Sequence, residues 1–274
     1  MRIALLDNGS LEAAAHRSLR AMASGLGART GLRVEAISWR HSDRIPAGEL
    51  DGAPASTLGP WTRTRLREGE SEFVFVPYLV SAEGAIAAAM RADLETLRRE
   101  AGGFAFTFTS GLAPAAETLG RIAAARVRET AAARTLGRPA VIVVDHGGPS
   151  RASAALRDAV ASEVRSRLGD LAAAVAAASM ESPEGSDFVF NQPLLADLLG
   201  SPGFDGGGVV IAPLFLSAGR HAGPGGDLAR IACAAEKRCP GLSCHFSGLI
   251  GGHPLAAEAF ARNLRARVPH PAIL

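Results

Sequence analysis

The sequence of 274 residues lacks the features that mark several common classes of protein. Only 5% of its residues are aromatic, and its only cysteines are Cys233, Cys239 and Cys244. An odd count without a CxxC pair argues against a disulfide framework or a zinc knuckle, so we expect small, buried, reduced side chains on a helix and the following strand. No apolar run reaches the length of a membrane span. The 29 basic and 27 acidic residues form no block that would favour nucleic acid or a membrane as a partner.

What the sequence has in quantity is aliphatic residues. Hydrophobic residues make up 47% of the chain, which predicts a globular protein with a core of Ala, Val and Leu. The short apolar run at the start is ended by Asp7, so it is too short for a secretory signal and is better explained as a first strand. We therefore expect a cytoplasmic protein.

The chain contains one internal repeat. Three segments recur in the same order at a spacing of roughly 140 residues, namely 5–10 with 143–148, 75–82 with 211–218, and 110–112 with 247–249. Ordered matches at nearly one spacing are hard to obtain by chance. We therefore predict two homologous halves, residues 1–137 and 138–274.

Each half is predicted to alternate strands with helices. The run 140–144 is apolar throughout, as expected of a strand buried on both faces of a parallel sheet. One face of an amphipathic helix follows, with a capping Gly169 after Leu156, Val160, Val164 and Leu168. Further strands are predicted at 2–6, 32–38, 72–76, 104–108, 173–180, 208–214 and 242–248, and a last helix at 254–268. This order implies an α/β fold with parallel sheets covered by helices on both faces.

Three metal-capable residues of the second half fall where such sheets bind ligands, beyond the carboxyl ends of the strands. His146 ends the first predicted strand, Glu181 ends the second, and His221 follows the third. Strand ends on one edge of one sheet can converge on one point. Two imidazoles and a carboxylate suit a divalent transition metal such as Co2+, Ni2+, Fe2+ or Zn2+. The sequence therefore predicts a metal site at these residues.

The first half keeps the scaffold but has Asn8, Arg40 and Ala85 at the three equivalent positions. A guanidinium cannot ligate a cation and alanine has no donor atom, so we expect the first half to hold no such metal. Taken singly, each candidate has an ordinary explanation, as a histidine that bonds the backbone of a turn or as a solvated carboxylate. Their joint placement, and their joint loss in the other half, favour a site.

At these residues the chain resembles the class II tetrapyrrole chelatases, which include the sirohydrochlorin cobaltochelatases and ferrochelatases. The motifs that carry the resemblance are Asp145-His146-Gly147, Ser179-Met180-Glu181 and the segments 213–221 and 248–255. The resemblance covers the second half, whereas the first half matches the scaffold only, as in the long, duplicated members. Two segments depart from the family pattern, at Gly148 and from Ala222 onward.

The resemblance implies two tandem flavodoxin-like lobes, each a small parallel sheet with helices on both faces, and a cleft for the flat macrocycle. It implies a lyase reaction, the ATP-independent insertion of Co2+ or Fe2+ into sirohydrochlorin or a related tetrapyrrole, in cobalamin or siroheme biosynthesis. By match to the motifs, His146 and His221 bind the metal, and Glu181 shares in ligation or accepts a proton. The predicted contacts to the substrate are Ser217, Arg220 and His253.

The resemblance implies a tetrapyrrole and a divalent metal, Co2+, Fe2+ or Ni2+, as partners, and no further cofactor. Two other functions stay open. The departures at Gly148 and Ala222 also fit a carrier that binds metal or tetrapyrrole without turnover. The same three metal-capable residues also fit a hydrolase that activates water. Neither the physiological metal, the exact tetrapyrrole nor the oligomeric state can be read from the sequence.

Overall fold

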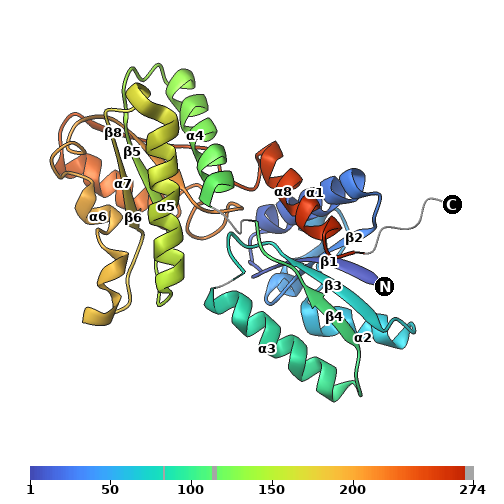
Figure 1. Cartoon of the computed structure of the whole chain (residues 1–274). Helices are drawn as coiled ribbons and strands as arrows, with labels where there is room; N and C mark the ends of the chain where they lie inside the picture. The colour runs from blue at the N-terminus through green and yellow to red at the C-terminus, as the bar shows by residue number, and fades with distance from the viewer. Residues whose placement is uncertain (83, 113–115, 269–274) are drawn as a thin grey trace. The chain divides into compact units, whose positions relative to one another are not determined.

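The structure is a computed structural model that describes residues 1–82, 84–112 and 116–268. The chain forms two compact units, a first unit of Met1–Pro114 with Pro254–Leu274 and a second unit of Ala115–His253 (Figure 1). Each unit contains one four-stranded sheet in which every pair of neighbouring strands is parallel. No helix in the described part of the chain is both long and apolar enough to cross a membrane.

The sheet of the first unit has the order β2-β1-β3-β4. Its strands are β1 (Arg2–Asp7), β2 (Val34–Ser38), β3 (Glu72–Pro77) and β4 (Ala105–Phe108). Its helices are α1 (Ala13–Thr30), α2 (Leu58–Arg67), α3 (Ala85–Glu100) and α8 (Pro254–Arg265), with short 3-10 turns η1 (Ser42–Arg44) and η2 (Ala47–Leu50). Helices α1 and α8 lie on one face of this sheet and α2 and α3 on the other (Figure 1).

Several aromatic residues of the first unit gather between this sheet and helices α2 and α3. The rings of Trp61 and Phe73 lie 5.8 Å apart at 68°, and Phe104 meets Phe73 at 5.3 Å and 78°. Such edge-to-face pairs contribute about 0.5–1.5 kcal/mol beyond the burial of their area. The prediction of a core made of Ala, Val and Leu therefore omitted the aromatic part of the core in the first unit. The low aromatic content of the whole chain gave no sign that these residues would cluster.

The sheet of the second unit has the order β6-β5-β7-β8. Its strands are β5 (Ala140–Asp145), β6 (Ala174–Ser179), β7 (Gly207–Pro213) and β8 (Leu242–Phe246). Its helices are α4 (Ala116–Ala133), α5 (Arg151–Leu168), α6 (Leu195–Leu198) and α7 (Asp227–Arg238), with 3-10 turns η3 (Gly169–Leu171) and η4 (Ser186–Asn191). Strand β5 is buried on both faces as predicted, because its four central residues are fully buried although successive side chains point to opposite faces.

The two sheets have the same strand order, each with its first strand in the second place. This order matches the flavodoxin-like arrangement, in which the chain winds outward from the first strand in both directions. The predicted α/β fold of two homologous lobes with parallel sheets is therefore confirmed. Two details of the second lobe differ from the sequence predictions. None of the three cysteines is buried as predicted, since Cys233 on α7 is exposed and Cys239 and Cys244 are half-buried. In α5, Arg157 rather than Leu156 takes the buried position.

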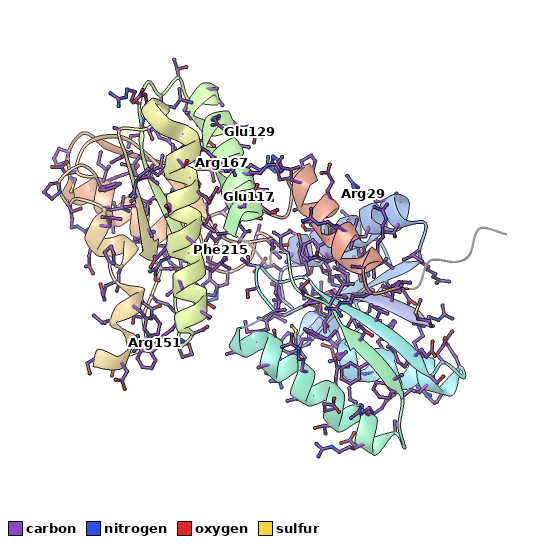
Figure 2. The ribbon with its side chains drawn as sticks, in the orientation of Figure 1. Arg29, Glu117, Glu129, Arg151, Arg167 and Phe215 are labelled. Carbon is purple, nitrogen blue, oxygen red and sulfur yellow. The ribbon has the colours of Figure 1, made fainter. Side chains whose placement is uncertain are left out.

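The last helix of each repeat packs in the other unit. Helix α4 follows β4 in the chain but packs against α5, where Gly120 lets the helices approach so closely that a Cβ atom there would lie 2.3 Å from Cβ of Glu163. Glu117 of α4 also meets Arg167 of α5, at 3.7 Å (Figure 2). Helix α8 follows β8 but packs against α1, and its Phe260 ring lies 5.5 Å from Tyr78. The compact units thus divide the chain differently from the sequence repeat.

Two buried titratable side chains, Asp7 and His16, lie on either side of Ser38 in the first unit. Burial raises the pKa of Asp7 to about 6 against a hydrogen bond from Ser38, and burial together with the charge of Arg20 lowers the pKa of His16 to about 4. The hydroxyl of Ser38 lies 3.5 Å from Nδ1 of His16. Oδ1 of Asp7 and Nε2 of His16 are buried without a hydrogen-bond partner among the described residues.

These two groups give opposite pH dependences to the stability of the fold. His16, with its lowered pKa, stabilises the folded state as the pH rises from about 4 to 6.5, whereas Asp7, with its raised pKa, destabilises it as the pH rises from 3.8 to about 6. Each shift corresponds to about 3 kcal/mol. We expect the free energy of unfolding of Asp7→Asn, relative to wild type, to increase by about 2 kcal/mol between pH 4 and 6 in urea titrations, because this window covers most but not all of the titration. A constant difference across this range would contradict the assignment.

Candidate metal-binding site

The backbone places His146 and Glu181 next to each other beyond the ends of β5 and β6. Asp145 pairs with Ser179 at the end of the parallel ladder, so the two strands end level. The pairing continues past the strands, because the amide of Met180 donates to the carbonyl of Asp145 at 2.8 Å and the amide of Glu181 donates to that of His146 at 3.1 Å. The two residues therefore leave the sheet edge side by side.

The turn after His146 requires glycine. Gly147 has φ +83°, and a Cβ atom on it would lie 1.8 Å from the carbonyl oxygen of Glu181. Gly9 of the first unit has φ +89°, and its Cβ atom would lie 1.7 Å from the carbonyl oxygen of Arg40. The same close contact occurs in both repeats, so Arg40 occupies the structural position of Glu181.

We expect Gly147→Ala to weaken Co2+ binding by the second unit at least tenfold. Alanine in the left-handed region costs about 1–2 kcal/mol, and its Cβ atom would also push the Glu181 backbone away from His146. Equilibrium titration with Co2+ measures the effect. Gly9→Ala introduces the same strain into the first unit and provides the matched control, which should retain Co2+ affinity. Equal affinities in both variants would contradict a site built on this turn.

The buried side chain of Arg157 links the ends of β5 and β6. Arg157 is 1% exposed and donates to the hydroxyl of Ser179 and, at 3.0 Å, to the carbonyl of Phe190. The Ser179 hydroxyl in turn donates to Asp145 at 2.7 Å, and the Arg157 guanidinium lies 3.7 Å from the same carboxylate. Burial raises the pKa of Asp145, opposed by the Ser179 hydrogen bond and the charge of Arg157. This network anchors Asp145, which directly precedes His146, and Ser179, two residues before Glu181.

Buried Asn191 holds the loops that follow the two residues. Its side-chain amide donates to the carbonyl of Gly148 at 3.0 Å and to the hydroxyl of Ser182 at 3.2 Å, and its oxygen accepts from the Gly148 amide at 3.3 Å. Asn191 is 1% exposed. Our sequence interpretation identified neither Asn191 nor Arg157. The available signal was Arg157, a charged residue at the same helical spacing as buried Val160 and Val164.

The side chains of His146, Glu181 and His221 are neighbours at this edge. Nε2 of His146 lies 3.6 Å from Oε1 of Glu181, and the rings of His146 and His221 are 4.7 Å apart at 88°. Their side chains are 45%, 59% and 30% exposed respectively, so the site is open to solvent. Within the part of the chain that the structure describes, no three His, Cys, Asp or Glu side chains form a ready-made metal cluster. Metal ligation by these three therefore stays a prediction.

The residues predicted to contact the substrate lie on the neighbouring loops. Ser217 is half-buried in the loop after β7, and the loop that ends at His253 is tied to it by a hydrogen bond from the amide of Ile250 to the carbonyl of Phe215 at 3.0 Å. The side chain of Arg220 is 82% exposed, and its Nε lies 3.8 Å from Oδ2 of Asp227. Figure 2 places Phe215 in this unit, and its ring lies 6.4 Å from that of His221.

Asp227 begins helix α7 but does not cap it. Gly226 is the N-cap of α7, and Asp227 is the first helical residue. Its Oδ2 instead lies 2.6 Å from Nδ1 of His221, and its Oδ1 accepts from Arg230. The Arg230 hydrogen bond, followed by that of His221, lowers the pKa of the Asp227 carboxyl.

The equivalent edge of the first unit has a different chemistry. The guanidinium of Arg40 stacks on the ring of Trp39 at 4.0 Å and pairs with Asp93 at 3.2 Å. Ala85 begins α3, and Asn8 follows β1. The turn geometry thus places an arginine where the second unit has a carboxylate, in agreement with a metal site in one repeat only.

Comparison with known proteins points to one family. Residues 140–267 match the family model of CbiX. SirB from Bacillus subtilis with Fe3+ has a similar structure, with a TM-score of 0.67, 14% identity and coverage of 97% of this chain and 95% of that one. The structure of CbiX, the terminal enzyme for biosynthesis of siroheme in denitrifying bacteria, gives a TM-score of 0.62 at 17% identity, covering 98% and 100%. Among curated proteins no relative matches the sequence significantly. The resemblance of the second half to class II chelatases is confirmed, and the solved structures share the fold of the whole chain.

Proposed function

We propose that this protein inserts a divalent metal, Co2+ or Fe2+, into sirohydrochlorin or a closely related tetrapyrrole without ATP. The observation that carries the proposal is the meeting of His146, Glu181 and His221 at the sheet edge of the second unit, inside the segment that matches CbiX. Similarity to sirohydrochlorin chelatases supports a chelatase reaction. The choice between the two metals, and between siroheme and cobalamin synthesis, is part of the proposal.

The chemistry needs a site that holds the metal and then releases it. An open site with two or three protein ligands can pass its metal to the ring, whereas a closed set of four would retain it. Two pyrrole N–H protons must also leave as the metal enters. Neutral imidazole, with a reference pKa of about 6.5, suits both tasks at cellular pH. Nδ1 of His146 lies near the carbonyl of Gly147, and Nδ1 of His221 near Asp227, so Nε2 is the nitrogen left on each ring for metal or proton.

The proposal is tested by mixing the purified protein anaerobically with sirohydrochlorin and Co2+, Fe2+ or Ni2+. Insertion shifts the visible absorption bands of the macrocycle, and the rate is compared with that of the uncatalysed reaction. We expect acceleration with Co2+ or Fe2+. Its absence with all three metals, from folded protein, would refute the proposal.

The same assay separates the two alternatives. The Gly148 turn and the loop from Ala222 onward depart from the family pattern, which motivates a carrier that binds the ring and turns nothing over. Ring binding without insertion would support it. A metal-dependent hydrolase would instead cleave phosphate or carboxylate esters. Ser150, four residues after His146, caps helix α5 by accepting from the amide of Ser153 at 3.2 Å, so its hydroxyl already has a structural role.

A further inference from the structure

The feature that carries a further inference is the contact between Asp227 and His221. Oδ2 of Asp227 lies 2.6 Å from Nδ1 of His221, a length typical of charge-assisted hydrogen bonds. An ionised carboxylate can only accept, so Nδ1 donates and a neutral His221 ring keeps its lone pair on Nε2. Both side chains are partly exposed, Asp227 to 23% and His221 to 30%.

The two candidate histidines are held in different ways. Nδ1 of His146 lies 3.1 Å from the carbonyl of the adjacent Gly147, which is a neutral main-chain group. Nδ1 of His221 meets a charged side chain that is six residues away in sequence. His221 also lies in a loop rather than directly at a strand end. The orientation of the His221 ring is therefore not fixed by a strand, and the hydrogen bond to the Asp227 carboxylate fixes it instead.

The loop that separates these two residues is folded to bring them together. The amide of Gly223 donates to the carbonyl of Gly219 at 2.8 Å, and the amide of Leu228 donates to that of His221 at 3.1 Å. Gly226 makes this compact form possible. A Cβ atom on Gly226 would lie 2.6 Å from the carbonyl oxygen of Arg220 and 2.8 Å from that of His221. Gly226 therefore allows the loop conformation that places the Asp227 carboxylate beside His221.

Two exposed arginines also contact the carboxylate. Arg230, one turn along α7, donates to Oδ1 of Asp227, and Nε of Arg220 lies 3.8 Å from Oδ2. Their side chains are 67% and 82% exposed.

We propose that Asp227 is the positioning residue of His221, which fixes the tautomer and the orientation of the ring so that Nε2 is presented to the incoming metal. The inference rests on the proposed function and deepens it. Carboxylates that hold a metal-binding histidine through its second nitrogen typically contribute 10-fold to 100-fold in metal affinity. Asp227 itself touches neither metal nor tetrapyrrole in this role.

The test is a Co2+ titration of Asp227→Asn, which keeps the shape of the side chain and removes its charge. We expect Co2+ affinity to fall 10-fold to 100-fold and the visible bands of bound Co2+ to change, with an unchanged melting temperature. Gly226→Ala, which displaces the carboxylate and strains the loop, should also lower Co2+ affinity and change the visible bands, but with a lower melting temperature. Asp227→Glu, which restores the charge, should recover part of the affinity.

The matched control is Glu117→Gln, which removes an acidic residue from the first turn of α4 in the same unit. It should bind Co2+ as wild type does, because Glu117 contacts Arg167 and no candidate ligand. Wild-type affinity and spectrum in Asp227→Asn would overturn the inference. If wild type binds Co2+ but inserts no metal, the proposed function fails while this titration still decides the role of Asp227. A wild type that binds no Co2+ would overturn both.

Discussion

We expect His146→Ala and His221→Ala each to lower the rate of metal insertion into sirohydrochlorin at least about 100-fold. Each substitution removes a nitrogen that the proposed reaction needs for the metal and for the departing pyrrole protons. The fold should be retained, because the two side chains are 45% and 30% exposed and neither is part of the hydrophobic core. The anaerobic absorbance assay measures the rate, and circular dichroism with thermal melting checks the fold.

The repeat offers a matched control for these variants. Asn8 occupies the position of His146 in the first unit, before the same glycine turn. Asn8→Ala should therefore leave insertion close to the wild-type rate. Full activity in both histidine variants would refute the site, whereas equal losses in the asparagine and histidine variants would show that the assay reports general damage.

The second large effect is expected from Arg157→Met, which should destabilise the protein by about 3–5 kcal/mol. Methionine nearly fills the space of the arginine stem but leaves the buried Asp145 carboxylate without its cation and the Phe190 carbonyl without its donor. Removing one partner of a buried pair costs more than the pair contributes, because the remaining charge stays desolvated. Urea denaturation followed by far-UV circular dichroism measures the loss.

Two further variants isolate the buried charge as the cause. Asp158→Asn removes the other carboxylate that Arg157 meets, but the Asp158 side chain is 58% exposed, so the expected cost is below about 1 kcal/mol. Adding Asp145→Asn to Arg157→Met removes the orphaned charge and should restore part of the stability. A double variant less stable than Arg157→Met alone would contradict this explanation.

Most of the fold could be predicted because it depends on local patterns. The apolar run 140–144 has no polar residue to place on a solvent face, so only a strand covered on both sides fits it. The repeat then transferred this interpretation to weaker strands of the other half. The predicted strand ends also located His146 and Glu181 correctly at one sheet edge, since parallel strands of similar length end level.

The exchange of α4 and α8 could not be predicted. Each helix has an apolar face that fits either sheet, and nothing in the pattern states which sheet will receive it. The distinguishing contacts are tertiary, such as the close approach at Gly120 and the packing of Phe260 on Tyr78. A glycine within a helix and a phenylalanine on an apolar face have many common explanations, so neither identifies its partner.

The supporting residues of the site were missed for a similar reason. Arg157 follows Leu156, and a helical spacing of four that starts at the leucine looks complete without the arginine. Asp227 lies next to a helix start, where a cap is the common explanation. Its contact with His221 depends on how Gly223 and Gly226 let the loop fold, which sequence spacing alone does not reveal.

The exchanged helices also set the order in which the protein can fold as it leaves the ribosome. The sheet of the first unit is synthesised first, yet the helix that covers α1 follows β8 and emerges after the whole second unit. Helix α4 of the second unit is synthesised before β5, the first strand of that unit. All parts of the second unit are therefore present, and it can fold completely, once residue 253 has emerged. Although it is translated second, the unit with the candidate metal site can be completed first, while the first unit has only α1 on one face of its sheet until α8 emerges.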